Sequence, residues 1–202
     1  MSEPVSNILL ILANPNDDQD KRLSKITNLC QDFGQYINSK NVNVDSLELY
    51  KEEEFLSGEY LDSNNSKVLE YQIRINKADM IVIFHPVFLD GIPAVLKGFL
   101  ENILTVNFAF KTESRISIPL LTNKKCLVVA FDSRPVWQSK FVFGNQLHSF
   151  WNKTIFELTG IDGHLHIFGS FRSTIEKDTQ KWRQKVISLA NNIKIKPNVL
   201  DI

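Results

Sequence analysis

The sequence lacks several features that mark specialised classes of protein. It has only two cysteines, Cys30 and Cys126, which fall in a predicted helix and a predicted buried strand. A pair so far apart in the sequence is no disulfide framework, so reduced thiols are the simpler interpretation. The apolar run at residues 8–13 has only the length of a strand, and no basic region precedes it. Neither a signal peptide nor a transmembrane helix is therefore predicted, and we expect a cytoplasmic protein.

The chain also lacks net charge. Its 23 lysine and arginine residues equal its 23 aspartate and glutamate residues. Without a global field nothing draws the protein to polyanions, so no nucleic-acid partner is predicted. Internal repeats and low-complexity tracts are absent too, and the polar segment at residues 52–66 is interpreted as a surface loop. With 43% hydrophobic residues, the whole chain of 202 residues is expected to form one domain, residues 1–202.

What the sequence does contain is an alternation of apolar strands with amphipathic helices. Continuous apolar runs ended by turn residues are typical of strands that are buried on both faces of a parallel sheet. Apolar residues spaced three and four apart predict the helices, and Asp18 or Asp20 could cap the first of them. The strands are predicted at residues 8–12, 42–49, 80–84, 126–131 and 165–168, and the helices at residues 21–37, 67–77, 94–104, 146–159 and 179–193.

This order of elements predicts an α/β three-layer sandwich, in which helices cover both faces of a five-stranded parallel sheet. Five strands suggest the flavodoxin-like order. In such sheets a ligand binds beyond the carboxyl ends of the strands, where the winding reverses. The loops after the first, third and fourth predicted strands are therefore the candidate binding loops.

One of these regions carries a more specific pattern. Residues 84–99 read FHPVFLDGIPAVLKGF, which is an apolar strand, a proline, a few mostly aromatic residues and then Gly-x-Pro-Ala-x-Leu-Lys-Gly-aromatic. The pattern resembles the signature of the flavodoxin-like NAD(P)H:quinone oxidoreductase family, which includes ancillary oxidoreductases of potassium efflux systems. Residues 11–15, 107–110 and 167–169 support the resemblance, which spans residues 7–171.

The resemblance implies a homodimer that binds FMN or FAD without a covalent bond, takes hydride from NAD(P)H and reduces a quinone-like acceptor by two electrons. It also implies that the first loop holds the cofactor phosphates. The likeness places ring-binding amide donors at residues 87–90 and 131–134. The cofactor-binding residues predicted in this way are Asn14, Asn16, Pro86, Val87, Phe88, Leu89, Phe131, Asp132, Ser133 and Arg134.

The first loop differs from the family's usual sequence, because Asn14-Pro15 replaces His-Pro. Three carboxylates follow, those of Asp17, Asp18 and Asp20. They either repel a phosphate or only cap and solvate the start of a helix.

The other two loops differ as well. Phe88 and Leu89 stand where the family usually has Trp or Tyr, and residues 131–135 replace a Thr-Thr-Gly-Gly type of loop. Arg134 has two readings: it stabilises negative charge on a reduced flavin, or it is a surface arginine paired with Asp132.

Histidines and aromatic residues have alternative roles in the same region. His85 follows a buried strand at the ligand edge, and it is either a proton donor to the acceptor or a hydrogen-bonded structural residue. The spacing of His148, His164 and His166 does not suggest zinc, so no metal is predicted. An aromatic excess in the second half lines a substrate cavity or the dimer interface, or else fills the core; its members are Phe108, Phe110, Trp137, Phe141, Phe143, Phe150 and Trp151.

Three functions follow from these observations. The leading hypothesis is the flavin-dependent oxidoreductase, which predicts a yellow protein. The alternative is a regulatory or binding protein of the same fold without catalysis, such as an ancillary subunit that acts through a membrane transporter. A flavodoxin-type electron carrier is the third, and it is disfavoured because the signature at residues 84–99 belongs to the reductase branch.

Overall fold

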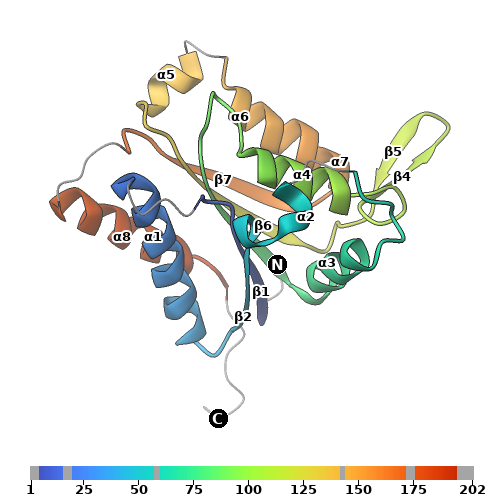
Figure 1. Ribbon diagram of the computed structural model, residues 1–202, viewed down its shortest axis with the longest axis horizontal. Coiled ribbons are helices and arrows are strands. Elements are labelled where there is room, and N and C mark those ends of the chain that lie inside the picture. Colours follow the sequence, from blue (N-terminus) through green and yellow to red (C-terminus); the bar gives the residue numbers. More distant parts are fainter. Residues whose placement is uncertain (1–4, 16–19, 57–59, 142–143, 172–175, 195–202) are drawn as a thin grey trace.

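The computed structural model describes residues 5–15, 20–56, 60–141, 144–171 and 176–194. Its centre is a five-stranded parallel sheet with the strand order β2-β1-β3-β6-β7 (Figure 1). The strands are β1 (Asn7–Leu12), β2 (Asn43–Glu48), β3 (Met80–Pro86), β6 (Lys125–Phe131) and β7 (Asp162–Phe168). The predicted α/β fold with a five-stranded parallel sheet is thus confirmed.

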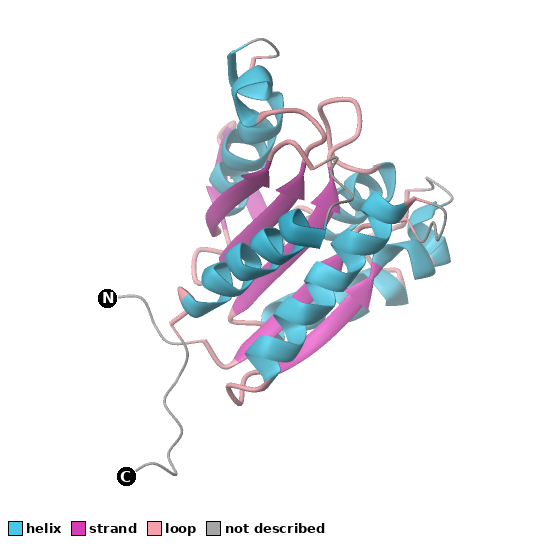
Figure 2. Cartoon of the chain, turned by 90° about the vertical axis from the view of Figure 1, so that its left-hand side faces the viewer, coloured by secondary structure: helices cyan, strands magenta, loops and turns pink. Residues whose placement is uncertain are grey.

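Helices cover both faces of this sheet and complete the three layers (Figure 2). On one face lie α1 (Lys21–Asn38) and α8 (Glu176–Asn191). On the other lie α3 (Ser66–Lys77), α4 (Ala94–Ile103) and a continuous helical segment made of α6 (Gln146–Ser149), η2 (Phe150–Phe156) and α7 (Glu157–Thr159). The described residues also include the short helices η1 (Leu49–Lys51), α2 (Glu53–Leu56) and α5 (Val136–Phe141).

The sheet divides the core into two parts because successive side chains of a strand point to opposite faces. On β1, Leu9 and Ile11 join the cluster under α3 and α4, whereas Ile8 and Leu10 join the cluster under α1 and α8. A strand covered on both faces therefore needs an unbroken apolar run, which is the signal that predicted β1, β3 and β6.

Helix α1 shows how the sequence determines one of these layers. It buries Ile26, Leu29, Phe33 and Ile37 at three- and four-residue spacing. Its N-cap is Asp20, whose side chain accepts a hydrogen bond from the Arg22 backbone amide at 2.8 Å. Of the two predicted caps, Asp20 is thus confirmed, while residues 16–19, with Asp17 and Asp18, lie outside the described residues.

The prediction of a surface loop at residues 52–66 is wrong at its start. That stretch begins with α2, which buries Phe55 in the core. The Phe55 ring packs 5.3 Å from the ring of Tyr71 and 5.2 Å from the ring of Phe99. A four-residue helix carries too little periodicity to be predicted from the sequence, and Phe55 therefore gives no separate signal of burial.

Two further elements depart from the predictions. The helix predicted at residues 146–159 contains the π-helical segment η2, and its Phe156 ring lies over Gly163 of β7. An antiparallel hairpin of β4 (Phe110–Glu113) and β5 (Ile116–Pro119) was not predicted. Its strands are short and largely exposed, so they lack the apolar alternation that marks a strand.

Candidate functional site

The carboxyl ends of β1, β3 and β6 lie side by side at one edge of the sheet. Leu12 pairs with Phe84, and Pro86 pairs with Phe131. Because these strands are parallel and in register, the loops that follow them meet at the place where open α/β sheets bind ligands. The predicted cofactor-binding residues lie in these loops and at these strand ends; one of them, Asn16, falls outside the described residues.

The loop after β3 forms a tight turn. The Phe88 amide donates to the Gly91 carbonyl at 3.1 Å, and the Gly91 amide donates back to the Phe88 carbonyl at 2.9 Å. Leu89 and Asp90 form the tip in the left-handed region, with φ of 48° and 65°. Such a two-residue turn requires positive φ at both positions.

This turn narrows the set of predicted amide donors. The Val87 amide donates to the Phe131 carbonyl at 2.9 Å, and the Phe88 amide is used within the turn. The amides of Leu89 and Asp90 form no hydrogen bond with any described residue. Two of the four expected donors in this loop are thus available to a ligand.

The loop after β6 is fixed by its own hydrogen bonds. The Asp132 amide donates to the Phe168 carbonyl at 2.9 Å, and the Arg134 amide donates to Asp132 Oδ1 at 2.9 Å. The Phe131 side chain is buried and stacks on the ring of Phe168 at 5.1 Å. Among residues 131–134, the Ser133 amide is left without a hydrogen bond to any described residue.

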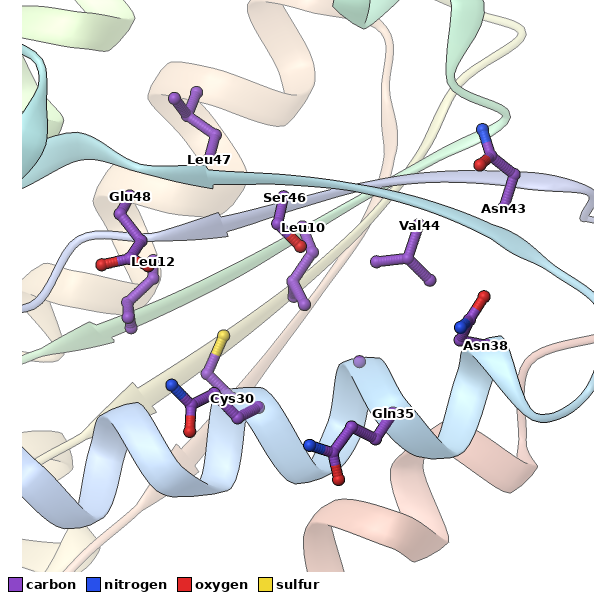
Figure 3. Close-up of a pocket in the computed structure, with 12 residues that line it drawn as sticks. Leu10, Leu12, Cys30, Gln35, Asn38, Asn43, Val44, Ser46, Leu47 and Glu48 are labelled. Carbon is purple, nitrogen blue, oxygen red and sulfur yellow. The ribbon is translucent and has the colours of Figure 1, made fainter.

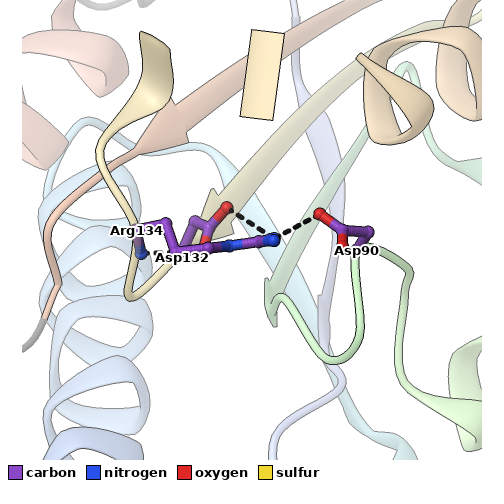
Figure 4. Close-up of polar contacts among 3 residues, drawn as sticks. All are labelled: Asp90, Asp132 and Arg134. Atoms are coloured by element: carbon purple, nitrogen blue, oxygen red, sulfur yellow. Dashed lines mark hydrogen bonds and ion pairs between the residues drawn. The ribbon is translucent and has the colours of Figure 1, made fainter. Parts of the chain in front are cut away.

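Arg134 links the two loops (Figure 4). Its Nε and Nη2 atoms each lie 3.3 Å from an oxygen of Asp132, and Nη2 also donates to Asp90 Oδ1. The hydrogen bond with Asp90 is the main reason that the pKa of the Arg134 guanidinium is raised. The predicted pairing of Arg134 with Asp132 is confirmed, whereas Asp90 as its second partner was missed.

The cavity that both loops line, beside this bridge, is small. Its volume is about 10 Å³, that of about one water molecule. It is lined by Val87, Asp90, Asp132, Asn145, Gln146, Leu147 and Ile167. A cavity of about 340 Å³ lies elsewhere, between α1 and β2 (Figure 3), and none of the predicted site residues line it.

Asn14, at the end of β1, is buried and faces the start of α1. Its Nδ2 atom donates to the Leu23 carbonyl at 2.8 Å and to Thr27 Oγ1 at 2.9 Å, so the amide group ties the first loop to the helix. Its Oδ1 atom is buried without a hydrogen-bond partner among the described residues. The Asn14 Nδ2 group therefore stabilises the fold through these two hydrogen bonds. A role of Asn14 in binding the cofactor stays a prediction.

His85 is fully buried beneath the same edge. Its Nδ1 atom lies 2.8 Å from the Pro86 carbonyl oxygen, and its ring packs 5.8 Å from the ring of Trp151. Burial lowers the pKa of His85 to about 4, so the ring is neutral near pH 7. The geometry favours the structural reading of this histidine, and its role as a proton donor stays a prediction.

The aromatic excess divides between core and surface. Trp151 is fully buried, and Phe108, Phe110 and Phe150 pack against the core, as the core-filling interpretation predicts. Exposed aromatic side chains lie on the α5 side of the site, at Trp137 and Phe141. Phe143 falls outside the described residues.

The cysteines and the side chains that could bind a metal complete the account of the predicted residues. Cys30 and Cys126 are both buried and free. Within the described ranges, no group of three or more His, Cys, Asp or Glu side chains is placed to hold a metal ion.

The strand order and the ligand edge define a flavodoxin-like α/β protein, and comparison with known proteins gives its family. A family model described as "Flavodoxin-like fold" matches residues 6–189, so the chain belongs to the Flavodoxin_2 family. The resemblance to the flavodoxin-like NAD(P)H:quinone oxidoreductases, predicted from residues 84–99, is confirmed.

Two curated relatives and one solved structure illustrate the similarity. A Haemophilus influenzae protein named "Uncharacterized NAD(P)H oxidoreductase" is 28% identical over 91% of this chain and 97% of its own. An FMN-dependent NADH:quinone oxidoreductase of Clostridium beijerinckii is 32% identical over 62% of this chain and 68% of its own. The structure of an FMN-dependent NADH-azoreductase from Bacillus anthracis in complex with FMN superposes with a TM-score of 0.71 at 20% identity, covering 94% of this chain and 99% of the other.

Proposed function

We propose that this protein is a flavin-dependent oxidoreductase that binds FMN at the carboxyl edge of the sheet, oxidises NAD(P)H and reduces a quinone-like acceptor. The observation that carries the proposal is the similarity to an NAD(P)H oxidoreductase over 91% of the chain. FMN is favoured over FAD because FMN appears in the names of both the Clostridium beijerinckii relative and the Bacillus anthracis structure. FMN, when bound, supplies the hydride-transfer chemistry.

The chemistry of the edge suits a flavin, whose ring carries carbonyl oxygens and nitrogens along one side. Amides without a bond to any described residue are found at Leu89, Asp90 and Ser133, on two loops that face the same gap. Arg134 adds a cation to this gap. Backbone amides and a guanidinium are the donors by which proteins hold anionic and carbonyl-rich ligands.

The cavity that Asp90 and Asp132 line does not hold a flavin as the described loops stand. Pockets that bind cofactors have volumes of about 300 Å³ or more, and this cavity measures about 10 Å³. The described residues therefore match the cofactor in chemistry, whereas this cavity does not match it in volume.

Other parts of the functional prediction stay proposals. A homodimer and a quinone-like acceptor are expected from the family, and a membrane-transporter partner belongs to the regulatory alternative. Both curated relatives named above are oxidoreductases, which favours the enzyme over that alternative. Among the described helices, none combines the length and the apolar character needed to cross a membrane.

The visible absorption spectrum tests the proposal. We expect the purified protein, incubated with excess FMN and passed over a desalting column, to keep flavin bands that NADH or NADPH bleaches without oxygen. Addition of a benzoquinone should then restore the bands. Protein that retains no flavin after this treatment would contradict the proposed activity and support the regulatory alternative.

A further inference from the structure

One side chain joins the two loops whose residues Asp90 and Asp132 line the small cavity. Arg134 spans the gap from its own loop to the loop after β3, where it reaches Asp90 (Figure 4). Its ion pair with Asp90 joins residues 44 positions apart in the sequence. This contact is therefore a tie between two binding loops rather than a local feature of one.

The two carboxylates that hold Arg134 are not equivalent. The Asp132 side chain is only 4% exposed and also accepts the Arg134 backbone amide, so it is fixed within its own loop. The Asp90 side chain is 23% exposed and sits at the tip of a turn, next to the fully exposed Leu89. Asp90 is therefore the partner that Arg134 can exchange for another anion, while Asp132 keeps the guanidinium in place.

The net charge of these three side chains also opposes the binding of an anionic ligand. Two carboxylates and one guanidinium leave the edge with one net negative charge among these three residues. As long as Asp90 occupies Arg134, an anionic ligand meets a neutralised cation and an adjacent negative charge. Removal of the Asp90 charge would take away the carboxylate on the loop after β3 that neutralises Arg134.

We propose that the Asp90–Arg134 ion pair is a latch that closes the flavin site, and that FMN binds by displacing Asp90 from Arg134. The inference rests on the proposed FMN-binding function and adds to it the residues that set the affinity. In this proposal Asp90 weakens the binding of FMN, and Arg134 is the cation that contacts FMN once Asp90 has been displaced.

The test is the affinity for FMN of the Asp90→Asn variant, measured from the quenching of FMN fluorescence. Asparagine is among the residues that best tolerate positive φ, so the turn is kept while the charge is lost. We expect Kd to fall about fivefold to tenfold, as loss of one adjacent charge near a protein surface implies. The control is Asp45→Asn, which removes the charge of the β2 carboxylate that pairs bidentately with Arg74 of α3 and should leave Kd unchanged.

A double-mutant cycle shows whether Asp90 acts through Arg134. In an Arg134→Gln background, Asp90→Asn should change Kd by less than about twofold, because the latch is already absent. An equal effect of Asp90→Asn in both backgrounds would overturn the latch and leave simple charge repulsion. A wild-type protein that binds FMN with an affinity that Asp90→Asn does not improve would overturn it as well, with the proposed function intact. If neither protein binds FMN, the proposed function itself fails, and the latch fails with it.

Discussion

At the scale of single residues, His85 is a buried group whose protonation the fold opposes. Its ring is fully buried, and burial lowers its pKa from 6.5 to about 4. The unfolded chain therefore binds a proton below pH 6.5 that the folded protein binds only near pH 4. The contribution of His85 to the free energy of unfolding is therefore fully present above pH 6.5, and it is lost as the pH falls toward 4. Between pH 7.5 and pH 5 the loss should be about 2 kcal/mol.

Urea unfolding at these two pH values measures the effect. The His85→Gln variant lacks the titrating ring, so its free energy of unfolding should fall by about 2 kcal/mol less than that of the wild type over the same range. His166, whose pKa is also lowered by burial, is present in both proteins and cancels in the comparison. Equal losses in the two proteins would mean that the His85 ring is free to take up a proton in the folded state.

Arg134 shows which contacts of the site a sequence can reveal. Its pairing with Asp132 was predictable, because two residues separated by one position in a loop lie within reach of each other. Its pairing with Asp90 was not, because it depends on the tight turn that places Leu89 and Asp90 at positive φ. Neither residue is the glycine or asparagine that usually marks such a turn, so the sequence carried no signal for it.

At the scale of elements, the contact of η2 with β7 depends on the absence of a side chain. A Cβ atom added at Gly163 would lie 2.4 Å from three atoms of the Phe156 ring. The π-helical segment that carries Phe156 cannot shift alone, because Trp151 and Ile155 of the same segment are buried. We expect Gly163→Ala to lower the free energy of unfolding by about 1–3 kcal/mol through overpacking.

Gly98 in α4 offers the matched control. An added Cβ atom there would lie 3.5 Å from the Phe55 carbonyl oxygen, which is ordinary contact. Gly98→Ala should leave stability unchanged or raise it by up to about 1 kcal/mol, because alanine favours the helix. Urea unfolding of both variants measures these changes in the free energy of unfolding. A Gly163→Ala protein as stable as the wild type would show that Phe156 can move away.

The C-terminal end of α3 is held by a lysine from the turn before β6. Lys124 is buried, and its Nζ atom donates to the carbonyl oxygens of Asn76 at 2.6 Å and Ala78 at 2.8 Å. A cation at this end of a helix satisfies free carbonyl groups and complements the helix dipole. Lys124→Met should therefore lower the free energy of unfolding by about 1.5–3 kcal/mol, the range for hydrogen bonds to charged groups.

Lys51 provides the comparison for that variant. It pairs with Glu48 at 2.9 Å, but its side chain is 61% exposed. Lys51→Met should change stability by less than about 1 kcal/mol, as is usual for exposed ion pairs. Chemical denaturation of the two variants gives both values; similar small losses would show that the Lys124 contacts contribute little beyond their burial.

The elements themselves were predictable in proportion to their burial. Strands β1, β3 and β6 are covered on both faces and appear as unbroken apolar runs, and α1 and α3 show clear helical spacing. Helix α2 and the β4–β5 hairpin are too short, or too exposed, to leave a periodic signal. The π-helical segment was missed because one added residue in a helical turn changes the spacing only locally.

At the scale of the whole molecule, the fold followed from the alternation of elements and from the signature at residues 84–99, since both describe the central sheet. The size of the candidate binding site did not follow from them, because it depends on how loops from three strands meet. FMN at this edge would contact loops that come together only in the folded chain. Binding should therefore stabilise the folded state by mass action, by about 2.7 kcal/mol when FMN is present at one hundred times its Kd.

Urea unfolding followed by circular dichroism, with and without FMN, measures this linkage. The midpoint should rise with FMN while the slope m stays the same, because the same surface is exposed on unfolding. Inorganic phosphate at the same concentration is the control, since it supplies an anion without the ring and should leave the midpoint unchanged. If FMN binds yet the midpoint does not move, the unfolded chain binds FMN as well as the folded one. The carboxyl edge would then not be the site, because its three loops are brought together only by the parallel sheet.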